Sequence, residues 1–132
     1  MAERYIEGIG RRKTATARVR LTPAKETSVL VNDRALAEYF IHATHQKTVL
    51  GILNVEEAGI QNYTITAHVM GGGLTAQCEA IRLGIARALV EEKADRRSPL
   101  KKLGFLKRDP RSVERKKFGL KKARKHPAWS KR

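Results

Sequence analysis

The sequence predicts an α+β fold, in which helices cover one face of a β-sheet, followed by a strongly basic C-terminal tail. Three observations support this prediction. Alternating apolar and polar residues indicate strands at 14–22 and 63–69. Helical apolar spacing follows the second strand, and strands joined to such helices pack in two layers. Residues 101–132 carry fourteen Lys and Arg but only two acidic residues, which accounts for +12 of the net charge of +15.

The strand predicted at 14–22 has one apolar and one cationic face. Its apolar residues alternate with polar ones, so they all point to the same side of the sheet. Arg18 and Arg20 lie on the opposite side, which faces solvent. Pro23 interrupts the pattern.

Shorter elements fill the interval before the strand at 63–69. Residues 28–31 are expected to form a short strand, which ends at the turn signal Asn32-Asp33. A short helix is expected at 35–40. Residues 41–59 have helical apolar spacing without clear boundaries.

Gly71-Gly72-Gly73 leads into the clearest helix of the sequence. Apolar residues from Leu74 to Leu89 form one stripe at helical spacing, while Leu83 and Val90 lie on the opposite side. The helix is therefore expected to be covered on both faces. The triple glycine is interpreted as a tight turn that lets the helix pack closely on the sheet. Backbone contact with RNA is the alternative.

Another short helix is expected after the long one, with Ser98-Pro99 as its N-cap and first residue and Gly104 as its end. This helix closes a globular domain predicted at 1–104. Residues 105–132 are predicted to form a last strand and an extended basic tail. From Arg115 onward the chain has too few apolar residues to offset the entropy of ordering its backbone, so we expect a polyanion to order it.

The sequence predicts no catalytic or metal site. Its four histidines are scattered, and no carboxylate or cysteine completes a ligand set. Cys78 is the only cysteine, so an intrachain disulfide is excluded, and it falls on the apolar stripe of the long helix. The glutamates occur as adjacent pairs and do not converge as an acid and a base would. We therefore expect no enzymatic activity, no metal and no cofactor.

The positive charge favours a nucleic acid over a membrane as the partner. No apolar run approaches the roughly eighteen residues that span a bilayer. Residues 1–10 resemble neither a signal peptide nor a transit peptide. The single cysteine suits a reducing compartment, so a cytosolic protein bound to nucleic acid is expected.

Two groups of cations are candidate phosphate contacts, because Arg presents a planar fork to phosphate oxygens and Lys a mobile point charge. The first group precedes and lines the strand at 14–22, with a solvated charged face as its alternative interpretation. It comprises Arg11, Arg12, Lys13, Arg18 and Arg20. In the tail, Asp109 and Glu114 are expected to orient neighbouring arginines or to fix the last strand to the sheet edge. The second group comprises Arg108, Arg111, Arg115, Lys116, Lys117, Lys121, Lys122, Arg124 and Lys125.

Trp129, near the end of the tail, has two interpretations. Its ring can stack on a base or a ribose, or it can fill a hydrophobic site on a neighbouring protein. Pro127 disfavours helix nearby and so favours an extended backbone.

Motifs along nearly the whole chain resemble the bacterial-type small-subunit ribosomal protein nine family. They are GRRKTATARVRL at 10–21, GGG at 71–73, IARALV at 85–90, RDPRSVERKKFGLKKAR at 108–124 and SKR at 130–132. GRRKT alone is moderately specific, whereas the long tail motif with its terminal SKR is highly specific. Ala76, Lys107 and Trp129 depart from the family pattern, but none of these departures removes a cation.

The resemblance implies a two-layer sandwich similar to the second domain of ribosomal protein five, with a left-handed βαβ crossover. It implies a monomer in the head of the small subunit, where both groups of cations bind small-subunit rRNA beside other ribosomal proteins. The tail would reach the decoding region, where Ser130, Lys131 and Arg132 meet the anticodon stem-loop of the P-site tRNA. The SKR ending indicates a cytoplasmic ribosome of bacterial or plastid type, and the lack of a transit peptide favours synthesis in that compartment.

Two other classes of protein fit the sequence less well. An RNA-processing subunit, such as the protein of ribonuclease P, is also small, basic and similar in fold, but its arginine-rich helix motif is absent here. An architectural DNA binder would need a dimerisation or minor-groove device that the sequence lacks. We therefore expect neither DNA nor a membrane as a partner.

Overall fold

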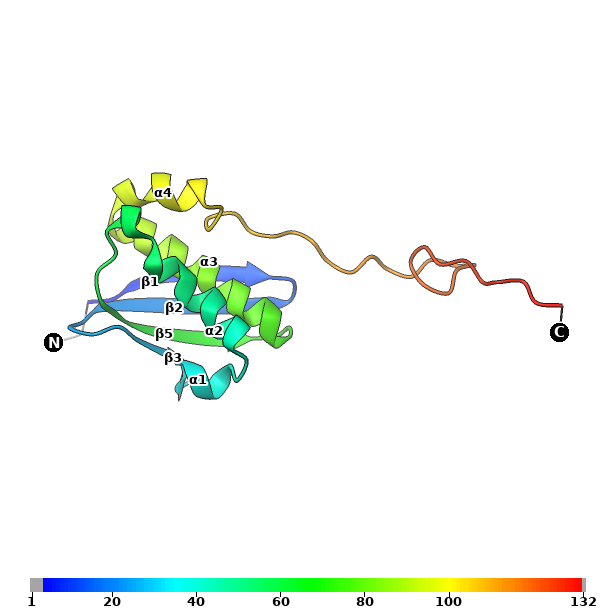
Figure 1. The fold of residues 1–132 in the computed structure, drawn as a ribbon, viewed down its shortest axis with the longest axis horizontal. Coiled ribbons are helices and arrows are strands. Elements are labelled where there is room, and N and C mark those ends of the chain that lie inside the picture. The colour runs from blue at the N-terminus through cyan, green and yellow to red at the C-terminus, as the bar shows by residue number, and fades with distance from the viewer. Residues whose placement is uncertain (1–3, 132) are drawn as a thin grey trace.

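Five strands form one mixed sheet in the order β1-β2-β5-β3-β4 (Figure 1). The structure, a computed structural model, describes residues 4–131. The strands are β1 (Ile6–Arg12), β2 (Ala15–Pro23), β3 (Ser28–Val31), β4 (Arg34–Ala35) and β5 (Tyr63–Met70). β3 pairs with β5 in parallel, and the other neighbouring strands are antiparallel.

The helices lie on one face of this sheet, where α2 and α3 run across the strands (Figure 1). The α-helices are α1 (Leu36–Tyr39), α2 (Ala43–Leu50), α3 (Leu74–Glu92) and α4 (Arg97–Lys102). Three 3-10 helices complete the chain up to α4, namely η1 (Gly51–Asn54), η2 (Glu56–Ala58) and η3 (Ala94–Arg96). The predicted α+β class, a sheet with helices on one face, is confirmed.

Strict alternation in β2 and β5 builds the core between the sheet and the helices. Val19 and Leu21 in β2 and Ile65 in β5 are fully buried against the helical layer. Their neighbours along each strand face the other side of the sheet and are half-buried or exposed. The strands predicted at 14–22, 28–31 and 63–69 are therefore confirmed.

The first strand, β1, was missed by the sequence analysis because two of its inward positions are glycines and give no apolar signal. A Cβ atom at Gly8 would lie 2.3 Å from the carbonyl oxygen of Gly84, and one at Gly10 would lie 1.8 Å from that of Ala80. The glycines thus let the backbone of α3 lie directly on β1, with Ala80, Gly84 and Ala88 on the facing side of the helix.

The triple glycine packs against the turn between β1 and β2. Gly71 and Gly72 adopt φ values of 76° and 63°, in the left-handed region that favours glycine. A Cβ atom at Gly71 would lie 2.5 Å from the carbonyl oxygen of Thr14. This geometry supports the interpretation of a tight turn that allows close packing.

The predicted start of the last helix is wrong. α4 begins at Arg97 and continues directly from η3, so Ser98 and Pro99 lie inside its first turn and Arg96 precedes it. Arg96 is only 2% exposed, and its guanidinium donates to the Glu92 carboxylate and to the carbonyl oxygen of Ala58. These bonds hold the chain in a helical conformation before Ser98 is reached.

The predicted last strand is also wrong, because residues 105–131 contain no strand as far as the structure describes them. At β1, the edge strand of the sheet, the carbonyl oxygen of Ile9 accepts a hydrogen bond from Arg87 Nη1 of α3 at 2.8 Å. Phe105 and Leu106 instead pack against the core. Beyond them, the chain extends away from the sheet and helices (Figure 1).

Candidate nucleic-acid interface

The sheet face opposite the helices is open and carries several of the predicted phosphate contacts. Strand register places Ile9, Arg18 and His68 side by side across β1, β2 and β5. All three are exposed, as is Arg11 in the next row of side chains. Thr16 and Met70 line a shallow hollow beside Arg18. The open face is therefore a cationic surface with small apolar patches, set on rigid strands.

Lys13 lies at the tip of the β1–β2 hairpin, whose turn consists of two residues between the paired Arg12 and Ala15. Its backbone has φ 51°, and its side chain is exposed. Lys13 therefore extends the cationic surface beyond the strands.

Arg20 is in the same face but is already paired. Its Nε donates to Glu7 Oε2 at 2.9 Å, and its guanidinium carbon lies 4.4 Å from the centre of the Tyr5 ring. The hydrogen bond with Glu7 raises the pKa of Arg20. About a third of its side chain is exposed, so Arg20 keeps one side available to a partner.

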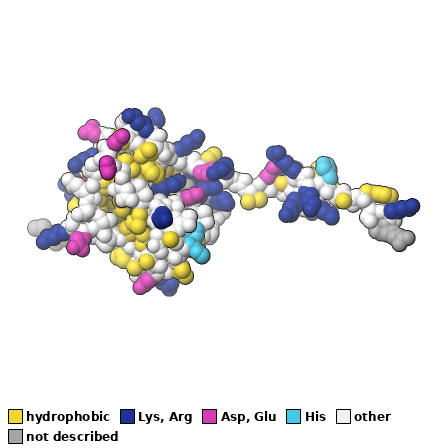
Figure 2. All heavy atoms as spheres, in the orientation of Figure 1, with side chains coloured by type: hydrophobic (Ala, Val, Ile, Leu, Met, Phe, Trp, Pro, Cys, Tyr) yellow, Lys and Arg dark blue, Asp and Glu magenta, His cyan; other side chains and the backbone are white. Residues whose placement is uncertain are grey.

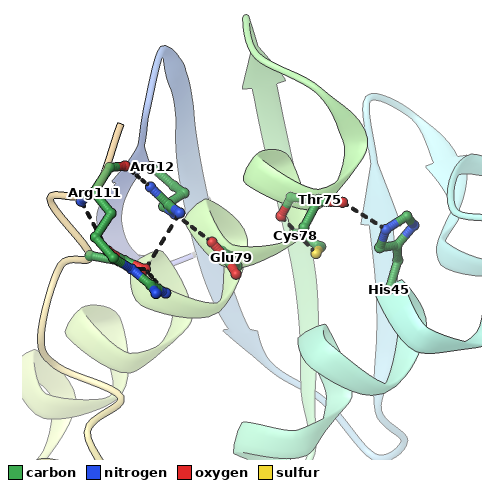
Figure 3. Close-up of polar contacts among 7 residues, drawn as sticks. Arg12, His45, Thr75, Cys78, Glu79 and Arg111 are labelled. Atoms are coloured by element: carbon green, nitrogen blue, oxygen red, sulfur yellow. Dashed lines mark hydrogen bonds and ion pairs between the residues drawn. The ribbon is translucent and has the colours of Figure 1, made fainter. Parts of the chain in front are cut away.

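Arg12 differs from the other four cations of its group because it points away from solvent. Its Nε lies 2.6 Å from Glu79 Oε2, and its Nη2 lies 3.4 Å from Asp109 Oδ2. Its Nη1 donates to the carbonyl oxygen of Arg111 (Figure 3). Only 11% of the side chain is exposed, so little of the guanidinium can meet a phosphate.

Asp109 binds both arginines of this cluster. Arg111 donates to it from its guanidinium, with Nη2 2.8 Å from Oδ2, and from its backbone nitrogen at 3.0 Å. The guanidinium of Arg111, helped by its backbone N–H and by Arg12, holds the pKa of Asp109 well below its usual range. Asp109 is thus a carboxylate that orients its arginine neighbours, as the sequence predicted.

The tail after Arg111 carries most of the remaining predicted contacts, and Figure 2 shows Lys and Arg side chains gathered along it. A local turn near its middle has Gly119 at φ 73°. In the same turn, the backbone nitrogen of Lys121 donates to the carbonyl oxygen of Lys125 at 2.8 Å. Glu114 bonds to Lys117 and to Nε of Arg124, the latter at 3.0 Å. Most of the predicted cations in this part of the tail are exposed. One acid, Glu114, cannot neutralise the nine Lys and Arg of residues 112–132.

Large apolar side chains of the tail are also exposed. Val113 is 88% exposed, Phe118 99% and Trp129 86%. Covering these side chains with a partner would remove their apolar surface from water, which is favourable. Ser130 and Lys131 follow Trp129, and Arg132, the last predicted tRNA contact, lies outside the described residues.

A metal cluster and a membrane-spanning helix are both lacking among the described residues. Residues 4–131 contain no group of three or more His, Cys, Asp or Glu side chains that could hold a metal ion. Within the same range, no helix is both long and apolar enough to cross a membrane. Cys78 is buried, and burial raises the pKa of its thiol.

The sequence analysis missed the acidic partners of this surface, Glu7 and Glu79. Glu79 lies one helical turn before Leu83, on the side of α3 that was expected to be covered. That position could have predicted an ion pair for Glu79, because a carboxylate on a covered face needs a cationic partner. Glu7 lies in β1, the strand that was not predicted because of its glycines.

A rigid cationic sheet face joined to a long cationic tail is the surface of a polyanion-binding protein. Comparison with known proteins shows the family to which the chain belongs. The chain belongs to the ribosomal protein S9/S16 family, whose profile matches residues 10–132.

Individual relatives match over nearly the full chain. The small ribosomal subunit protein uS9 of Mycobacterium tuberculosis is 50% identical over 130 residues, which cover 98% of this chain and 85% of the relative. The proteins of the same name from Mycobacterium avium and Mycolicibacterium paratuberculosis are 51% and 52% identical, covering 98% of this chain and 77% of each relative.

Proposed function

We propose that this protein is a structural, non-enzymatic component of the small subunit of a bacterial cytoplasmic ribosome and binds small-subunit rRNA. The observation that carries this proposal is the match of 98% of the chain, tail included, to relatives named as small-subunit proteins. The distribution of charge supports it independently, since residues 101–132 carry +12 of the net charge of +15 and Arg11, Lys13 and Arg18 are exposed at the open sheet face.

The sheet face positions the domain on folded rRNA. Arg11, Lys13 and Arg18 supply exposed cations on rigid backbone, and Arg20 adds a partly exposed guanidinium whose orientation is fixed by Glu7. Phosphate contacts of this kind recognise the shape of an RNA rather than its sequence. Arg12 contributes to the site through its internal contacts and not as a phosphate contact.

The tail supplies affinity and reach. Each phosphate that its exposed cations neutralise releases counterions, which adds binding free energy independent of sequence. The rRNA contacts proposed for it are Arg108, Arg111, Arg115, Lys116, Lys117, Lys121, Lys122, Arg124 and Lys125. Covering exposed Phe118 and Trp129 with RNA or a neighbouring head protein removes their apolar surface from water, which adds favourable binding free energy.

The end of the tail meets the P-site tRNA in this proposal. In the sequence, Ser130, Lys131 and Arg132 form a short polar and cationic end of the tail. Phosphate contacts from such a tip hold a tRNA without reading its anticodon, which suits a site that accepts every tRNA. The resemblance to the second domain of ribosomal protein five belongs to the same proposal, and the helical connection between parallel β3 and β5 supports it.

Co-sedimentation with small subunits at moderate salt tests the proposed function. We expect the full chain to migrate with small subunits from cells that express it as the only copy. Migration with an RNA-processing particle, or release from subunits at moderate salt, would contradict the proposal. A substitution of Arg97, an exposed cation in α4 away from the sheet face, serves as the control for unspecific charge effects.

A further inference from the structure

Arg12 connects three parts of the chain that are far apart in sequence. It ends β1, its Nε bonds to Glu79 in α3, and its other two nitrogens contact Asp109 and the carbonyl oxygen of Arg111. Figure 3 shows the guanidinium between α3 and the start of the tail. An arginine whose guanidinium contacts two carboxylates and a carbonyl connects parts of the protein and is not free to bind another anion.

An apolar contact holds the same segment of the tail a few residues earlier. Phe105 and Leu106 pack against the core, and the Arg82 guanidinium carbon lies 5.6 Å from the centre of the Phe105 ring. The backbone nitrogen of Phe105 donates to Leu100 at 3.1 Å. Leu83, on the outer side of α3, is 4% exposed beside this segment. Residues 105–111, which we call the tail root, are therefore docked on the domain beyond the boundary predicted at Gly104.

Beyond Arg111, the ion pairs of Glu114 with Lys117 and Arg124 are internal to the tail. The contacts of Arg12 link the domain to the tail root just before the tail leaves the sheet and helices (Figure 1).

The cluster is close to neutral, because the charges of Arg12 and Arg111 are balanced by those of Glu79 and Asp109. It therefore adds little to the attraction between the protein and a polyanion. Its contribution is geometric, since a root that is already fixed reduces the conformational freedom that the tail loses when it binds.

We propose that Arg12, Glu79 and Asp109 are positioning residues that clamp the tail root to the domain and aim the tail before any RNA is bound. The clamp is a property of the free protein. Its consequence for tRNA rests on the function proposed above, and the two are tested separately.

Hydrogen exchange of the full-length free protein, followed by mass spectrometry, tests the clamp. We expect the amides of Phe105, Lys107 and Arg111 to exchange about tenfold faster in Glu79→Gln, the size expected for loss of a charge-assisted hydrogen bond. Asp109→Asn should act in the same direction. Glu91→Gln is the matched control, because Glu91 is an exposed glutamate near the end of the same helix. Unchanged exchange of the tail root in Glu79→Gln overturns the proposal.

A second pair of variants separates the clamp from a phosphate contact and guards against a folding defect. Arg12→Lys keeps the charge but lacks the planar fork that reaches Glu79, Asp109 and the Arg111 carbonyl together, so it should loosen the root, while Arg11→Lys at the exposed neighbouring position should not. If Arg12 were instead a phosphate contact, Glu79→Gln would leave the root unchanged and bind rRNA as tightly or more tightly, because it removes a negative charge.

Retention of P-site tRNA by subunits that contain Glu79→Gln tests the aim of the tail. We expect such subunits to sediment normally and to lose tRNA several-fold faster than subunits with Glu91→Gln. A loosened root with unchanged tRNA retention overturns the aiming role. Failure of the unmodified protein to join subunits contradicts the proposed function and leaves the exchange result valid.

Discussion

The sheet face and the tail both present cations, but they hold them differently. On the sheet, the backbone is fixed by strand pairing, and acidic neighbours orient Arg20 and Arg12. In the tail after Arg111, exposed cations and exposed Phe118 lie in a local turn at 117–125, and exposed Trp129 follows that turn. The domain can therefore define a position by itself, whereas the tail needs a partner to cover its apolar side chains and neutralise its charge. The tail root belongs to the tail in sequence but, like the sheet face, is held by contacts within the protein.

Removing residues 112–132 should give the largest effect on binding and almost none on folding. The deleted segment carries nine Lys and Arg and one acid. We expect rRNA affinity to fall by about a thousandfold or more and its salt dependence to become shallower by roughly 0.7–0.9 in log–log slope per lost phosphate contact. Filter binding at several salt concentrations measures both. The unfolding midpoint should stay the same, and a large drop in it would show that the domain depends on the tail.

Gly10→Ala should damage the domain by a comparable free energy. The new Cβ atom would meet the backbone of α3, which cannot move without separating the helix from β1. We expect a loss of about 3 kcal/mol in the free energy of unfolding, at the upper end of the range for overpacking. Urea denaturation measures it. Gly51→Ala is the matched control, because a Cβ atom there has no neighbour within 4 Å, and equal losses in the two variants would contradict the close approach of β1 and α3.

Arg18→Gln tests the sheet face alone. We expect about a five- to tenfold loss of rRNA affinity, since one charged hydrogen-bonding group is removed from a rigid surface. The unfolding free energy should hardly change because Arg18 is exposed. Binding titrations beside Arg97→Gln check the effect. Equal losses in both variants would mean that only total charge matters and that the sheet face has no special role.

Deletion of residues 129–132 should leave subunit assembly nearly intact and release P-site tRNA several-fold faster, because the tip lies far from the folded domain. Dissociation of labelled tRNA from purified subunits measures this rate. Tight retention would contradict the tRNA contact. Trp129→Phe in the full chain keeps a stacking ring and should behave nearly as the unmodified protein does.

The smallest expected effect concerns the acid stability of the domain. Burial raises the pKa of the Glu92 carboxyl, but hydrogen bonds from Tyr63 and Arg96 outweigh burial, so the pKa of Glu92 is lowered in the folded protein. The stabilisation is therefore present above the unfolded pKa and is lost as the pH falls from about 5 to about 3. Denaturation at a series of pH values should show this loss, and Glu92→Gln should reduce its size. The same slope in both proteins would contradict a depressed pKa.

Much of the fold could be predicted from the sequence, because β2 and β5 alternate strictly and α3 has an apolar stripe. β1 could not, since its glycines encode contact with a helix some seventy residues away. The start of α4 is set by the long-range bonds of Arg96, which local capping signals do not reveal. The cationic residues were visible as a group, but their individual roles depend on distant carboxylates, and Arg12 looked like its neighbours until Glu79 and Asp109 were placed beside it.

Limited trypsin digestion of the full chain, free and bound to small-subunit rRNA, tests the central claim most directly. The account predicts that the free protein is cut rapidly after the basic residues from Arg115 to Lys131, that the bonds after Lys107 and Arg108 are cut slowly, and that rRNA protects the whole tail. Protection of the tail beyond Arg115 without RNA would contradict the claim that its partner supplies its order.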